Sequence, residues 1–201
     1  MIPQFRIGKI RQDLELDKLE YPPKYVLTEE DGLVCNVEYV DLRGFYPGDL
    51  RYLVSAERRI VSAAEREAGR DLNKFEELLD EMDGSGDWGK VSRQEFDALL
   101  TINVEMGMNS LVGAISACGC APVTSCRGHK KRSYTQPEAA FWAKRKGGEF
   151  ILEEAKKTDY VLLGDADVDG YHGEYIRIKN VLDAIRFADQ LDHALRGKRI
   201  R

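Results

Sequence analysis

A run of reactive and cationic side chains, CGCAPVTSCRGHKKR, occupies residues 118–132. It holds three cysteines, one histidine and four further basic residues within fifteen positions. Residues of these types support three kinds of chemistry. Thiolate and imidazole bind metal ions, a thiolate attacks electrophiles, and cations around a glycine bend hold an anion.

The first hypothesis is anion binding, because an apolar strand, APVTS, runs directly into this glycine bend. Gly128 lets successive backbone N–H groups converge on an anion, and Arg127 can hold an oxyanion with two hydrogen bonds. The ligand is then phosphate-bearing, a nucleotide or a nucleic acid. The alternative is a solvated turn whose charges keep the chain soluble. The predicted ligand-binding residues are Ser125, Arg127, Gly128, Lys130, Lys131 and Arg132.

The thiols allow two other interpretations of the same run. Cys126 is a candidate nucleophile, because Arg127 and His129 would favour its thiolate, although the sequence supplies no third, orienting group. Zinc is disfavoured for Cys118, Cys120, Cys126 and His129, because their C-x-C-x5-C-x2-H spacing lacks the two separated ligand pairs of familiar zinc modules. Free cysteines that fill small buried gaps are the alternative.

A second candidate site is the acidic stretch LLGDADVDGYHGE at residues 162–174. Asp165, Asp167 and Asp169 alternate there, and Mg²⁺ or Ca²⁺ prefers several such oxygen ligands. The Asp165/Asp167 pair resembles the D-x-D arrangement of metal-dependent glycosyl- and nucleotidyltransferases. His129 and His172 are the candidate proton carriers. A β-turn rich in Asp and Gly that binds no metal is the alternative.

The stretch DGSGDWGKVSRQEF at residues 83–96 resembles an EF-hand loop with one inserted residue, and the likeness covers residues 75–100. This resemblance implies a second calcium site. Its ligands would be Asp83, Ser85, Asp87 and Glu95. The insertion shifts Glu95 relative to the other ligands, and a capped connection between two helices is the alternative.

The stretch TSCRG at residues 124–128 resembles the serine-cysteine-glycine signature of the wybutosine-synthesis protein family, which acts on transfer RNA. The likeness covers four or five residues and ends at His129, where that family has arginine. It implies nucleic acid as a ligand and nothing more.

Charge is unevenly distributed along the 201 residues, whose net charge is −5. Residues 127–146 hold seven Lys or Arg and one acid, whereas residues 65–97 hold eleven acids and five bases. One basic island in an acidic chain excludes a general nucleic-acid coat and suits a local anion site. The acidic helical half supports another function, a non-catalytic regulatory or immunity-type protein that binds a basic protein partner. The composition predicts a cytoplasmic protein with free thiols and no membrane partner.

Apolar periodicity predicts an α+β fold with a mostly antiparallel sheet. We expect an N-terminal extension at 1–46 with a β-hairpin at 24–42, and a main α+β domain at 47–201. Helices are expected from 49 to about 69 and from 71 to 82, followed by a buried central helix from 92 to 117. The remaining elements should follow the order ββαββα: strands at 121–125 and 138–143, a helix at 149–157, strands at 159–164 and 174–178, and a helix at 180–195.

The relative position of two loops decides whether catalysis is expected. If loops 127–132 and 165–174 lie at one end of the sheet, a bound metal and a bound phosphate could support phosphoryl or nucleotidyl transfer. If they lie at opposite ends, this enzyme hypothesis loses its main support, and the sequence does not decide between the two arrangements.

Overall fold

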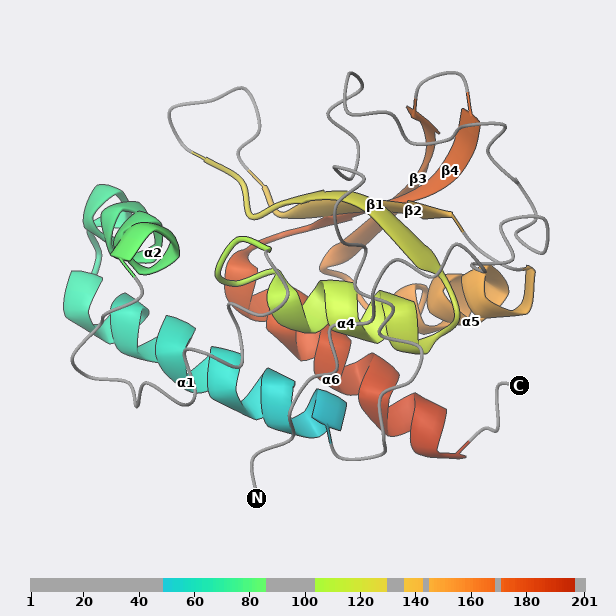
Figure 1. Cartoon of the computed structure of the whole chain (residues 1–201), viewed down its shortest axis with the longest axis horizontal. Coiled ribbons are helices and arrows are strands. Elements are labelled where there is room, and N and C mark those ends of the chain that lie inside the picture. The colour runs from blue at the N-terminus through green and yellow to red at the C-terminus, as the bar shows by residue number, and fades with distance from the viewer. Residues whose placement is uncertain (1–48, 86–103, 130–135, 143–144, 169–170, 198–201) are drawn as a thin grey trace.

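The computed structural model describes residues 49–85, 104–129, 136–142, 145–168 and 171–197 (Figure 1). In chain order the elements are α1 (Asp49–Ala68), α2 (Leu72–Ser85), α4 (Asn109–Ala117), β1 (Ala121–Cys126), β2 (Glu138–Trp142), α5 (Arg145–Ala155), β3 (Val161–Val168), β4 (Tyr171–Ile178) and α6 (Val181–Gly197). The α+β class and the ββαββα order after α4 are confirmed. The predicted hairpin at 24–42 lies outside the described residues, and the division at residue 46 stays a prediction.

Helices α1 and α2 follow from their apolar periodicity. The buried positions of α1 recur at helical spacing and form one face, as do those of α2. These positions are Leu50, Leu53, Val54, Ile60, Val61 and Ala64 in α1, and Leu78, Leu79 and Met82 in α2. Gly69, with φ +63°, ends α1. Asp71 then caps α2, because its Oδ1 accepts the backbone N–H groups of Asn73 and Lys74 at 3.0 and 3.2 Å.

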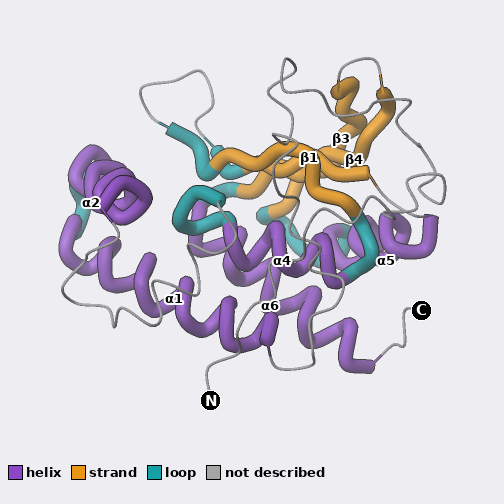
Figure 2. The backbone as a smooth tube through the Cα atoms, viewed as in Figure 1, coloured by secondary structure: helices purple, strands orange, loops and turns teal. Residues whose placement is uncertain are grey.

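The four strands form one antiparallel sheet in the order β1-β2-β4-β3. Cross-strand pairs fix its register, with Cys126 opposite Glu138 and Glu138 opposite Arg177. Helices α4, α5 and α6 cover one face of the sheet, and α1 packs on the far side of α4 and α6 (Figures 1 and 2). The core lies between these layers, because Phe141 and Ile176 of the sheet are fully buried there. Within the described part of the chain, no helix is long and apolar enough to cross a membrane.

The expected central helix is shorter than its sequence pattern indicates. Helix α4 begins at Asn109, residues 104–108 are not helical, and residues 92–103 lie outside the described residues. The break falls at Gly107, whose φ is +99° and where a Cβ atom would meet Val181 Cγ1 at 2.3 Å. Close packing against α6 therefore requires glycine in a conformation that no helix has. The expected burial of this segment is confirmed, because residues 109–116 are all buried.

The acidic stretch lies largely in a β-hairpin, although a loop was expected at 165–174 between strands at 159–164 and 174–178. β3 continues to Val168, and β4 begins at Tyr171. The backbone at Asp165 pairs with Glu174, and the backbone at Asp167 pairs with His172. Pairing with the neighbouring strand outweighs the weak strand propensity of Asp and Gly.

Candidate functional site

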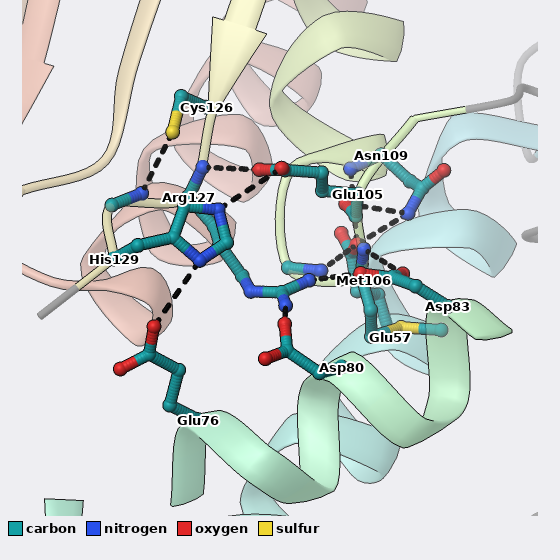
Figure 3. Close-up of polar contacts among 12 residues, drawn as sticks. Glu57, Glu76, Asp80, Asp83, Glu105, Met106, Asn109, Cys126, Arg127 and His129 are labelled. Carbon is teal, nitrogen blue, oxygen red and sulfur yellow. Dashed lines mark hydrogen bonds and ion pairs between the residues drawn. The ribbon is translucent and has the colours of Figure 1, made fainter. Parts of the chain in front are cut away.

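The candidate site lies where the chain leaves β1 beside the turn before α4 and one face of α2 (Figure 3). Side chains from three segments far apart in sequence meet there. They are Glu76, Asp80 and Asp83 of α2, Glu105 of the turn before α4, Cys126 at the end of β1, and Arg127 and His129 after it.

Arg127, the residue expected to hold an oxyanion, is only 3% exposed. Its Nη1 and Nη2 form ion pairs with Asp83 and Asp80, respectively. Its backbone N–H donates to Glu105 Oε2 at 2.8 Å, whereas the buried Nε has no hydrogen-bond partner in the described structure. The guanidinium is therefore held by carboxylates of its own chain.

His129 lies between two carboxylates, with its side chain 9% exposed. Nδ1 is 3.2 Å from Glu76 Oε1, and Nε2 is 3.1 Å from Glu105 Oε1. An imidazolium would donate to both carboxylates. A neutral imidazole has only one N–H, so its other ring nitrogen is a hydrogen-bond acceptor. That nitrogen faces a carboxylate oxygen, which is an acceptor too. A proton or a metal ion must lie between such a pair of acceptors.

The thiol of Cys126 is half-buried, and its Sγ accepts the backbone N–H of Gly128 at 3.3 Å. Burial raises its pKa above 9.0, the charges of Glu105 and Glu138 raise it further, and the Gly128 N–H and the charge of Arg127 only partly oppose them. The lowering expected from Arg127 is thus outweighed. These surroundings favour the thiol over the thiolate, which does not support a thiolate nucleophile.

Glu105 completes a possible metal-binding group. Burial alone would raise its pKa, but the hydrogen bonds and positive charges of Arg127 and His129 outweigh burial and hold the pKa below 4.5. One ligand atom each from Glu105, Cys126 and His129 lie within 4.8 Å of one another. Carboxylate, thiol and imidazole are all ligands of transition metals.

A buried carboxylate, Glu57 of α1, fixes the turn that carries Glu105. Its Oε1 accepts the backbone N–H groups of Gly107 and Asn109 at 2.7 and 3.0 Å, and the Asn109 Nδ2 at 2.9 Å. Its Oε2 accepts the backbone N–H of Ser110 at 2.7 Å. Helix α4 has no side-chain cap from its own N-cap residue. Glu57 of α1 instead accepts the buried backbone N–H groups at the start of α4.

Asp83 supports the same turn from α2. Its Oδ1 accepts the backbone N–H of Met106 at 2.7 Å, while its Oδ2 pairs with Arg127. Among the described residues of this region carboxylates therefore outnumber cationic groups, since Glu76, Asp80, Asp83 and Glu105 contact Arg127 and His129. This excess of negative charge favours a bound cation over a bound phosphate.

The other predicted residues of the basic bend are only partly described. Ser125 is half-buried in β1, and Gly128 has φ +81°, as a glycine bend requires. Lys130, Lys131 and Arg132 lie outside the described residues. Among the expected ligand-binding residues, the structure therefore describes Ser125, Arg127 and Gly128.

The basic bend and the aspartate cluster lie at opposite ends of the sheet. The pairing places Cys126 level with Arg177 of β4, whereas Asp165 is level with Glu174. These two β4 positions are about 10 Å apart along the strand. Asp167 lies farther along the hairpin, and Asp169 lies outside the described residues. The expected phosphoryl or nucleotidyl transfer therefore loses its main support.

The EF-hand resemblance falls partly on described residues. Asp83 and Ser85 belong to the last turn of α2 instead of a loop, and Asp83 is engaged by Arg127. Asp87 and Glu95 lie outside the described residues, so the calcium site stays a prediction.

Cys118 and Cys120 are buried where α4 joins β1, at the end of that strand remote from Cys126. Burial raises the pKa of Cys118 well above 9.0 and that of Cys120 to about 12. The four ligands considered in the sequence thus do not form one cluster. Cys126 and His129 are instead joined by Glu105.

Sequence reasoning did not select Glu57, Glu76, Asp80 or Glu105. One signal was available, because Glu76, Asp80 and Asp83 recur at the spacing of one helical face. For Glu57 and Glu105 the sequence offers no such pattern.

Comparisons of the chain with protein-family models, curated proteins and solved structures give no match.

Proposed function

We propose that this chain binds a divalent transition-metal ion through Glu105, Cys126 and His129. The chemical types of these three ligands favour Zn²⁺. The observation that carries the proposal is the convergence of their ligand atoms within 4.8 Å. A cysteine sulfur, which a bound metal ion deprotonates, suits zinc together with an imidazole and a carboxylate better than it suits Mg²⁺ or Ca²⁺, which prefer oxygen ligands alone.

The geometry around His129 supports the proposal. In a tetrahedral zinc site, bond lengths of about 2.0–2.1 Å place two N or O ligands about 3.3 Å apart. His129 Nε2 and Glu105 Oε1 are 3.1 Å apart. Glu76 lies at the other ring nitrogen, which matches the carboxylate–histidine–metal arrangement of protein zinc sites.

Three protein ligands leave one coordination position of a tetrahedral ion for water or a substrate. Glu105 and Cys126 are both partly exposed, so this position can be reached from solvent. The site therefore supports metal binding with an accessible ion, and this is the function that the geometry favours.

The other functions inferred from the sequence stay predictions. A phosphate-binding site would require Arg127 to leave two aspartates, or would depend on residues 130–132. A basic partner on the acidic helices would meet α2 on a face other than the one whose acids contact Arg127 and His129. The thiolate-enzyme hypothesis needs a thiolate that the surroundings of Cys126 disfavour.

The purified, metal-stripped chain is expected to bind one Zn²⁺ ion. Competition against a chromogenic chelator measures the affinity, and Co²⁺ substitution should produce a thiolate-to-metal charge-transfer band. Cys126→Ser should remove this band and weaken zinc binding by more than about 100-fold, since even changes to residues that only hydrogen-bond a metal ligand weaken it about 10- to 100-fold.

Cys118→Ala is the matched control, because Cys118 lies outside the cluster, and it should bind zinc as the wild type does. Wild-type protein without stoichiometric zinc, or Cys126→Ser with unchanged affinity, would contradict the proposal.

A further inference from the structure

We infer that Glu76 is a positioning residue for the metal ligand His129, and that through this contact metal binding fastens α2 to the end of β1. This inference rests on the proposed metal site. It concerns the regulation of that site, because helix α2 would be held more firmly when the site contains a metal ion.

The first step concerns the two nitrogens of His129. If the metal takes Nε2, on the side of Glu105, then Nδ1 must carry the proton. Nδ1 is 3.2 Å from Glu76 Oε1, so this carboxylate accepts the Nδ1–H and fixes both the tautomer and the ring orientation. The Glu76 and His129 side chains are 16% and 9% exposed, which keeps competing water away from the bond.

The second step concerns how α2 is held. Its apolar face is buried, and α1 is the element against which it packs most extensively. Toward the residues after β1 it presents an acidic stripe at helical spacing, Glu76, Asp80 and Asp83 (Figure 3). Asp80 and Asp83 bind Arg127, which takes no part in the metal cluster. Glu76 is thus the residue of the stripe that contacts a proposed metal ligand.

The third step is thermodynamic. If docked α2 raises the affinity of the site for metal, then bound metal must stabilise docked α2 by the same factor. An ion bound at Nε2 leaves the Nδ1–H of His129 for Glu76, the contact that the structure places at 3.2 Å. Metal occupancy is thereby transmitted from a site after β1 to a helix about 50 residues earlier in the chain.

The test compares Glu76→Gln with Glu77→Gln, an exposed neighbour on the same helix. Chelator competition with Zn²⁺ should show affinity 10- to 100-fold weaker in Glu76→Gln and unchanged in Glu77→Gln. The visible bands of the Co²⁺-loaded protein should shift only in Glu76→Gln, because the ligated imidazole becomes less basic.

Hydrogen exchange gives a second readout, which begins with the wild-type protein. Adding Zn²⁺ to the wild type should slow amide exchange in residues 72–85, and this protection should shrink in Glu76→Gln but not in Glu77→Gln. If zinc binds the wild type and either its affinity is unchanged in Glu76→Gln or the exchange of α2 is unaltered by zinc, the inference is overturned while the metal site stands. A wild type that takes up no zinc overturns both.

Discussion

Replacing Asp83 with alanine is expected to lower the free energy of unfolding of the metal-free protein by about 3–5 kcal/mol. Asp83 pairs with Arg127 and accepts the backbone N–H of Met106 at 2.7 Å. The Arg127 side chain is 2% exposed, so the variant retains a buried guanidinium with half of its counter-charge and a backbone donor without a partner. Chemical denaturation at neutral pH, followed by circular dichroism, measures the change.

Arg127→Met is the matched control, because it removes the other partner of the ion pair between Asp83 and Arg127. Its effect should be smaller, about 1–2 kcal/mol, since the Asp80 and Asp83 side chains are 56% and 28% exposed and can be hydrated. In the Arg127→Met background, Asp83→Ala should lose most of its effect. An Arg127→Met effect that exceeds the Asp83→Ala effect would contradict the assignment of Arg127 as a buried structural cation.

Glu57→Ala is expected to destabilise the protein by about 3–5 kcal/mol. The Glu57 side chain accepts four hydrogen bonds from buried donors at the start of α4, at 2.7 to 3.0 Å. Alanine leaves these donors unpaired and disturbs the turn that presents Glu105. Thermal and chemical unfolding measure the loss, and zinc affinity should fall with it because Glu105 loses its support. A change below about 1 kcal/mol would show that solvent replaces these bonds at little cost.

The pH dependence of this effect has a defined sign. Burial raises the pKa of Glu57 above 4.5, although hydrogen bonds from Ser110, Asn109 and Gly107 oppose the rise. The folded protein therefore holds this proton more tightly than the unfolded chain, and the contribution of Glu57 to stability is greatest below pH 4.5. It declines as the pH rises through the folded-state pKa. The stability of the wild type relative to Glu57→Gln should thus decrease as pH increases from 4.5, and an increase would contradict the raised pKa.

The secondary structure was predictable wherever one local pattern dominated. The apolar stripe of α1 and the Asp71 cap of α2 act within one or two helical turns, so the sequence alone predicts both helices. The strand and helix order after α4 follows from the same local signals. At Gly107, by contrast, the apolar pattern continues through the turn, and tertiary contacts fix the turn: Glu57 of α1 accepts the Gly107 N–H, and Val181 leaves no room for a Cβ atom at residue 107.

The sequence by itself determined which groups are able to do chemistry here. Cys126, Arg127 and His129 sit on a glycine bend after a strand, and that placement was predictable from their spacing. Their partners were not predictable. The acids of α2 that bind Arg127 are 44 and 47 residues away in the chain, and Glu105, which contacts His129, is 24 residues away.

Only the tertiary structure decided that Arg127 and His129 of the bend face carboxylates of their own chain. Local sequence determines backbone conformation, because its energies act between neighbouring residues. The partner of a charged side chain depends on which distant surfaces the core brings together, and burial then determines the strength of the contact. Beside three acidic residues of α2 and Glu105, the start of this bend therefore carries a Glu/Cys/His group that could hold a metal ion, the function that we propose.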